Sequence, residues 1–226
     1  MDLSSLQTLF IPLLQIIGIN IVLSGDNAVV IALASRALPP EQQRRAIAWG
    51  SGAAIVMRIV LTFTAVALLE MPYLKLVGSL FLIWIGIQLL DSDEEDGPVE
   101  SGGTVATAIR TILIADLVMS LDNVLGVAAA AKGNTLLLVL GLGISIPLVI
   151  FGANLLLRLM ERFPIIVTLG AALLGYVGGE MAVNDLAVVG WIDSHFYALH
   201  QIVPIGCAAF IVVVGKLMAA RRQSAA

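Results

Sequence analysis

The chain contains long apolar stretches that follow one another with only short polar breaks. Seven such stretches lie at residues 9–34, 46–69, 73–90, 104–131, 135–157, 165–183 and 202–219. A helix needs about 20 mostly apolar residues to cross a bilayer. Only 12% of the residues are charged, against about 25% in soluble domains. The sequence therefore predicts an all-α membrane protein with seven transmembrane helices and no separate soluble domain.

Other features of the composition exclude several classes of protein. The first apolar stretch has no basic segment before it and is longer than a signal-peptide core, so we expect it to be retained as a helix. Cys207 is the single cysteine, which excludes an internal disulfide and a cysteine-rich soft-metal site. No Walker-type glycine-rich loop is present, so ATP is not expected to be the direct energy source. We expect no nucleic-acid partner.

Basic residues are distributed unevenly along the chain and predict the orientation. Arg58 lies within the second stretch, and Lys75 and Lys132 lie in loops on one side. The other nine basic residues fall on or near the opposite side, at Arg36, Arg44, Arg45, Arg110, Arg158, Arg162, Lys216, Arg221 and Arg222. Loops rich in Lys and Arg face the cytoplasm. This predicts an N-terminus outside the cell and a C-terminus in the cytoplasm.

Two short polar segments interrupt the apolar stretches and match each other. The segment from Asn20 to Asn27 (NIVLSGDN) aligns with the segment from Asp116 to Asn123 (DLVMSLDN), 96 positions later. Further pairs match at offsets of 92 and 91, namely Gly78 with Gly170, Gly86 with Gly178, Gln88 with Glu180, Gly50 with Gly141 and Gly52 with Gly143. The matches predict two three-helix repeats. Because three is odd, the second repeat is inverted relative to the first.

The repeats define the expected organisation of the chain. We expect a first three-helix repeat at residues 1–90, an acidic cytoplasmic linker at 91–103, an inverted second repeat at 104–183, an outer loop at 184–200, and a seventh helix with a basic cytoplasmic tail at 201–226. The linker holds six carboxylates and three glycines, which is typical of a solvated, flexible segment, although a cation-collecting role remains open. The outer loop is also expected to be solvated, because the spacing of its Asn184, Asp185, Asp193, His195 and His200 is not that of a structural zinc site.

The polar segments predict a cation site within the membrane. A charged group in the bilayer centre costs about 2.5–3.5 kcal/mol on insertion scales, so such residues usually line an ion or substrate path. The candidate ligands are Asn20, Ser24, Asp26 and Asn27 in the first segment and Asp116, Ser120, Asp122 and Asn123 in the second. Their hard oxygen donors suit Mg²⁺, Ca²⁺ and Mn²⁺. Inverted repeats place such a site near the midplane.

Several details of this site remain open at this stage. The Ser24-Gly25 pair is a plausible kink, whereas Leu121 replaces the glycine in the second segment and predicts a straighter helix. Arg58 needs a carboxylate or backbone oxygens, and serves either as a structural partner or in gating. The Asp residues themselves could instead pair with a basic group or cap a broken helix. Carboxylates that lose a cation accept protons readily, which favours proton exchange.

These motifs and the compact seven-span layout resemble the TerC-type integral membrane protein family, in particular its YjbE-like branch, within the LysE-type transporter superfamily. The resemblance covers nearly the whole chain. It implies export of Mn²⁺ across a bacterial plasma membrane, with Mn²⁺ as the transported substrate and no cofactor. It implies metal binding by Asp26, Asn27, Asp122 and Asn123, then by Asn20 and Asp116. Glu180 is a further candidate ligand, although its counterpart Gln88 is uncharged.

The predicted function is therefore a secondary transporter, not an enzyme, and two alternatives are weighed against it. An exporter of an amino acid or small organic cation would need an aromatic or amphipathic pocket. Trp49, Trp84 and Trp191 lie toward span ends instead, where interfacial anchoring explains them. An intramembrane aspartyl hydrolase is disfavoured because Leu23 stands where the first glycine of Gly-x-Gly-Asp belongs. The sequence leaves the oligomeric state open.

Overall fold

The chain is helical throughout the part that the structure describes. The computed structural model describes residues 17–18, 25–69, 71–91, 104–131 and 134–223. Eight helices and no strand occur there: α2 (Gly25–Ser35), α3 (Pro40–Leu69), α4 (Leu74–Asp91), α5 (Val105–Ala131), α6 (Thr135–Arg162), α7 (Ile165–Val183), α8 (Val189–His195) and α9 (Leu199–Gln223). The prediction of an all-α protein is confirmed.

Five segments are long and apolar enough to cross a membrane. They are Pro40–Thr64, Leu74–Asp91, Val139–Arg162, Ile165–Val183 and Leu199–Arg221, in the described part of the chain. Two predicted stretches, 73–90 and 165–183, agree closely with α4 and α7. The polar segments belong to the two remaining long stretches, which contain α2 and α5. A multi-span membrane protein is thus supported, while the total of seven spans stays a prediction.

The outer surface of the bundle has the character of a lipid-facing surface. Many large apolar side chains are largely exposed, among them Val60, Phe63, Leu80, Phe151 and Phe210. So many exposed large apolar side chains are unusual on a soluble protein and indicate contact with a membrane or a partner. Inside, the main core of buried apolar residues reaches from Leu33 on α2 to Ile211 on α9.

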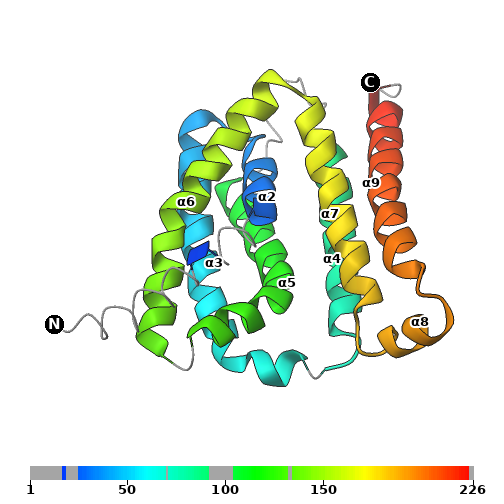
Figure 1. Cartoon of the computed structure of the whole chain (residues 1–226). Coiled ribbons are helices and arrows are strands. Elements are labelled where there is room, and N and C mark those ends of the chain that lie inside the picture. Colours follow the sequence, from blue (N-terminus) through cyan, green and yellow to red (C-terminus); the bar gives the residue numbers. More distant parts are fainter. Residues whose placement is uncertain (1–16, 19–24, 70, 92–103, 132–133, 224–226) are drawn as a thin grey trace.

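The helices form two groups that mix the two predicted repeats (Figure 1). In one group, α2, α3, α5 and α6 pack against one another, and in the other group α4, α7 and α9 do so. The groups meet where α4 contacts α5 and where α2 contacts α7. Since α3 packs on α5 and α4 packs on α7, each group holds helices from both halves of the sequence. The predicted repeats therefore do not form separate bodies.

Glycines on α7 allow this helix to approach α9 very closely. A Cβ atom at Gly179 would lie 2.6 Å from the Cα of Pro204, and one at Gly175 would lie 2.6 Å from the carbonyl oxygen of Cys207. Both neighbours are backbone atoms, which cannot move aside as a side chain can. Small residues commonly let membrane helices pack at such short range.

Asp185, directly after α7, holds the start of α4 in place. Its side chain is fully buried. Oδ1 accepts hydrogen bonds from the backbone N–H groups of Tyr73 (2.9 Å) and Ala187 (2.8 Å), and Oδ2 accepts from those of Lys75 (3.0 Å) and Leu76 (3.1 Å). Burial acts to raise the pKa of Asp185, but the four bonds outweigh it and hold the pKa below its usual value.

The expectation that Asp185 belongs to a solvated outer loop is therefore wrong. The carboxylate instead satisfies N–H groups that the first turn of a helix leaves unpaired. Tyr73 has a φ of 69°, which places the turn before α4 in the left-handed region. The predicted loop also contains the helix α8, and His200 pairs with Asp193 there at 2.8 Å.

Candidate cation site

The second polar segment is engaged by Arg58, which reaches it from α3. The Nη2 of Arg58 donates a hydrogen bond to Oδ1 of Asp116 within an ion pair. Its Nε donates to the Oγ of Ser120 at 2.9 Å, and that hydroxyl donates to Oδ2 of Asp116 at 3.2 Å. Arg58 is 3% exposed and Asp116 is 6% exposed. Of the partners considered for Arg58, a carboxylate is the one observed.

Regular helix geometry explains why these groups meet. Asp116 and Ser120 are four residues apart on α5 and therefore share one face of the helix. That face lies against α3, the helix that carries Arg58. Both carboxylate oxygens of Asp116 already accept hydrogen bonds, so its charge is balanced within the protein. The role of Asp116 and Ser120 as metal ligands stays a prediction.

The first polar segment contains a buried amide with no partner. Asn27 on α2 is 3% exposed, and neither its Oδ1 nor its Nδ2 makes a hydrogen bond within the described chain. A buried amide without a partner costs about 1–3 kcal/mol. The neighbouring Asp26 is partly buried, and its Oδ1 accepts the backbone N–H of Asn27 at 2.8 Å.

Asp26 of the first polar segment lies near Asp116 of the second. α2 packs against α5, and the Asp26 carboxyl is close enough to Arg58 and Asp116 to interact electrostatically with both. Asp26 and Asp116 therefore lie near each other, whereas the convergence of Asp26 and Asp122 stays a prediction, because the side chain of Asp122 lies outside the described residues. Arg58 also lies at this junction, so the site contains one internal cation in addition to its carboxylates.

Several predicted ligands lie outside the described residues. Asn20 and Ser24 do so entirely, as does the side chain of Asp122, and with them the expected kink at Ser24-Gly25. α5 continues unbroken through the second segment, as Leu121 predicts, and Asn123 is partly buried on it. Among the side chains described, no three His, Cys, Asp or Glu come together as metal ligands.

Glu180 does not share the burial of the other candidates. Its side chain is exposed near the end of α7, and its backbone oxygen accepts hydrogen bonds from the backbone and side-chain N–H groups of Asn184. Its counterpart Gln88 is exposed on α4. Both belong to the helix group opposite the one that carries Asp26 and Asp116.

Sequence reasoning missed one contact that joins the two helix groups. The Nη2 of Arg36, just after α2, donates to the carbonyl oxygen of Leu89 near the end of α4 at 2.8 Å. In the sequence, Arg36 reads only as one of the basic residues that set orientation. A contact across 53 positions leaves no local signal.

Comparisons with known proteins give a consistent result. A family model described as "Integral membrane protein TerC family" matches residues 5–224. The chain is 43% identical over 203 residues to "Uncharacterized membrane protein YjbE" of Bacillus subtilis (strain 168), which covers 90% of this chain and 93% of that protein.

More distant relatives also match. The chain is 25% identical to "Uncharacterized membrane protein YkoY" of the same strain, over 93% of this chain and 72% of that protein. It is 25% identical to "UPF0053 protein YegH" of Escherichia coli (strain K12), over 78% of this chain and 37% of that protein. No solved structure matches.

Proposed function

Since the chain belongs to the TerC family of integral membrane proteins, we propose that it is a secondary transporter that exports a hard divalent cation, with Mn²⁺ as the first candidate. The observation that carries the proposal is the buried amide of Asn27 beside Asp26, which has no hydrogen-bond partner in the described part of the chain. In this proposal the chain crosses a bacterial plasma membrane seven times, with its C-terminus in the cytoplasm.

The amide of Asn27 favours a site that binds a ligand. Buried polar groups in native proteins are nearly always paired, so an exception calls for an explanation such as an ion. A hard cation bound by Oδ1 of Asn27 and the carboxylate of Asp26 would offset the cost of burying them. Amide and carboxylate oxygens are the ligands that Mn²⁺ and related cations accept.

The charge balance favours a divalent ion. Arg58 neutralises Asp116, so Asp26 and Asp122 are the acidic residues of the two polar segments that remain for a ligand. Two carboxylates balance one divalent cation in a medium where net charge is costly. After release of the ion, the same carboxylates can accept protons, which supports exchange of the cation for protons.

The packing of matched glycines supports an inverted repeat around this site. A Cβ at Gly78 on α4 would lie 2.8 Å from Cγ1 of Val118 on α5, and a Cβ at its match Gly170 on α7 would lie 2.8 Å from Cγ1 of Val29 on α2. Each glycine thus faces the polar-segment helix of the other half. α2 also packs on α6 and α7 as α5 packs on α3 and α4. Transporters with inverted repeats bind substrate where the repeats meet.

The substitution Asn27→Leu tests the proposal because it removes the amide while keeping a side chain that branches at Cγ and has the same number of non-hydrogen atoms. We expect the variant to be at least as stable as the wild type, since it no longer buries unpaired polar atoms, and to lose uptake of labelled Mn²⁺ into everted membrane vesicles. Asn154→Leu is the matched control, because the Nδ2 of Asn154 donates to the Ile150 carbonyl within α6 at 2.7 Å. It should retain transport.

Two results would contradict the proposal. Unchanged Mn²⁺ uptake by a folded Asn27→Leu variant would remove Asn27 from the site. Uptake of labelled lysine, but not of Mn²⁺, by the wild-type vesicles would favour export of an amino acid instead.

A further inference from the structure

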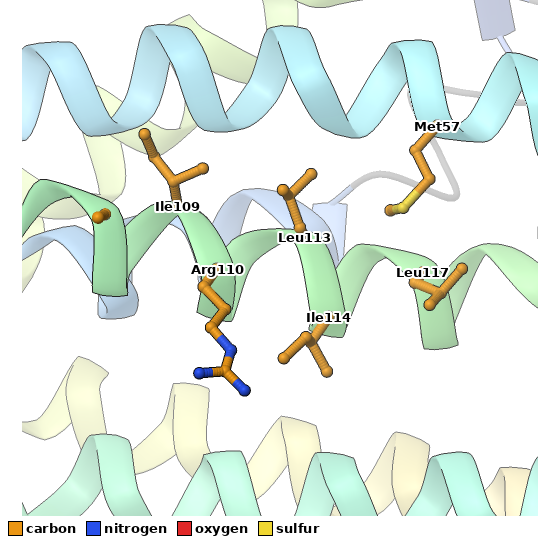
Figure 2. A pocket seen from close by; sticks show the side chains of 7 residues that line it. Met57, Ile109, Arg110, Leu113, Ile114 and Leu117 are labelled. Carbon is orange, nitrogen blue, oxygen red and sulfur yellow. The ribbon is translucent and has the colours of Figure 1, made fainter.

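One face of α5 forms the floor of an open apolar groove beside α3 (Figure 2). The groove has a volume of about 520 Å³ and is lined by Met57 of α3 and by Ala106, Ile109, Arg110, Leu113, Ile114 and Leu117 of α5. The α5 residues recur every three or four positions, which places them along one helix face. The groove is distinct from the buried junction around Arg58, since neither Arg58 nor Asp116 lines it.

Arg110 is the single charged residue that lines the groove. Its side chain is exposed in the second turn of α5, and it makes no hydrogen bond or ion pair within the described chain. In Figure 2 its guanidinium extends from α5 on the side away from α3, near Ile114. A guanidinium stays charged in any environment. On an apolar, outward-facing helix surface the guanidinium of Arg110 therefore needs an anion from outside the protein as its counter-charge.

The dimensions of the groove fit one leaflet of a bilayer. Leu117 lies eleven positions after Ala106, which corresponds to about 16 Å of helix. This is close to half of the roughly 30 Å hydrocarbon core. Arg110 lies toward the end of α5 that the basic residues predict to be cytoplasmic. An acyl chain lying along Ile109, Leu113 and Leu117 would thus start at the level of the guanidinium.

We propose that this groove binds an anionic phospholipid, with the lipid phosphate on Arg110 and an acyl chain on the apolar floor. Guanidinium and phosphate form paired, charge-assisted hydrogen bonds, and basic pockets between helices on the cytoplasmic side bind anionic headgroups. An apolar helix from a second copy fits less well, because it would bury Arg110 without a counter-charge. The site is independent of the proposed cation transport.

Native mass spectrometry of the full-length protein in detergent tests the proposal, with phosphatidylglycerol and phosphatidylcholine as probes. We expect the wild type to retain phosphatidylglycerol in preference to phosphatidylcholine. Arg110→Gln should weaken phosphatidylglycerol retention by about fivefold or more, the effect of one basic residue near a membrane surface. Arg158→Gln is the matched control, because Arg158 is exposed on α6 and does not line the groove.

A second variant distinguishes the contribution of the apolar groove to lipid binding from that of the Arg110 charge. Leu113→Trp keeps Arg110 but fills the groove, and should reduce the retention of phosphatidylglycerol as well. Equal retention by wild type and Arg110→Gln, or no preference between the lipids in the wild type, would overturn the proposal. A dimer of the wild type would also overturn the proposal if both groove variants dissociated it and phosphatidylglycerol did not affect it. That result would assign this face to contact with a second copy of the chain. If Arg110→Gln fails to fold, unchanged retention by Leu113→Trp is sufficient to refute it.

Discussion

Two buried polar residues near the α2–α5 contact, Arg58 and Asn27, differ in whether they have partners in the described chain. The guanidinium of Arg58 is matched by Asp116 and Ser120, so its charge is balanced inside the protein. The amide of Asn27 is equally buried but has no partner in the described chain. The first arrangement holds α3 and α5 together, and the second is suited to a ligand. The contrast separates a structural role from a candidate binding role among residues of similar burial.

The ion pair predicts a specific pattern of stability. Arg58→Met leaves the carboxylate of Asp116 buried without a counter-charge, which should lower the free energy of unfolding by about 3–5 kcal/mol. The double variant Arg58→Met/Asp116→Leu removes both charges and should recover most of that loss. Thermal unfolding of the purified proteins in detergent measures both effects. Arg44→Met, at an exposed position near the start of α3, provides the control. A double variant no more stable than Arg58→Met would contradict the structural role.

At the scale of the helices, short-range packing on α7 and the capping of α4 stabilise one of the two groups. Gly175 and Gly179 bring α7 against the backbone of α9, and Asp185 ties the end of α7 to the start of α4. Arg36 ties the end of α2 to α4 across the group boundary. The group of α4, α7 and α9 is therefore stabilised by close helix packing and by hydrogen bonds at its helix ends.

Two glycine substitutions should have opposite effects. Gly179→Ala places a methyl group against the backbone of Pro204, and overpacking of this kind typically costs about 1–3 kcal/mol. Gly206→Ala meets no atom within 4 Å, and alanine is favoured over glycine in a helix by up to about 1 kcal/mol. The melting temperatures in detergent should therefore fall for the first variant and hold or rise for the second. Equal melting temperatures would show that α7 and α9 are not in close contact.

At the scale of the whole molecule, the proposed transport would be served by movement of one helix group against the other. Asp26 and Asn27 of the first polar segment lie on α2 and the second segment lies on α5, both in the same group, while α4 and α7 border these helices from the other group. Movement of one predicted repeat against the other would require α3 to leave α5 and α4 to leave α7. Movement of one group against the other keeps these contacts.

Cysteine cross-links distinguish the two kinds of movement in a Cys207→Ala background. The pair Gly78→Cys/Val118→Cys joins α4 to α5 across the boundary, where a Cβ at Gly78 would lie 2.8 Å from a γ carbon of Val118. The pair Leu90→Cys/Gly215→Cys joins α4 to α9 within one group, where the two Cβ atoms would lie 3.0 Å apart. We expect oxidation to stop Mn²⁺ transport only in the first pair, and a reductant to restore it. Loss of transport in the second pair alone would contradict the proposed grouping.

The sequence by itself determined the features that depend on neighbouring residues. The length of an apolar stretch is a local property, so the bounds of α4 and α7 follow closely from residues 73–90 and 165–183. The requirement that an intramembrane Arg58 find a carboxylate or backbone oxygens also follows from its own chemistry and depth. The match between the two polar segments identified Asp26 and Asp116, which the structure places near the α2–α5 contact.

Only the tertiary structure decided which of these residues meet. Arg58 and Asp116 are 58 positions apart, and Asp185 holds Tyr73 from 112 positions away. No pattern along the chain distinguishes Asp116, which is neutralised, from Asp26, which lies beside an unpaired amide. The grouping of α4, α7 and α9 is equally hidden, because it depends on which apolar faces pack together. Which helices pack together depends on how their side chains fit in three dimensions. Because the helices are similarly apolar, the chain is compatible with many alternative helix pairings.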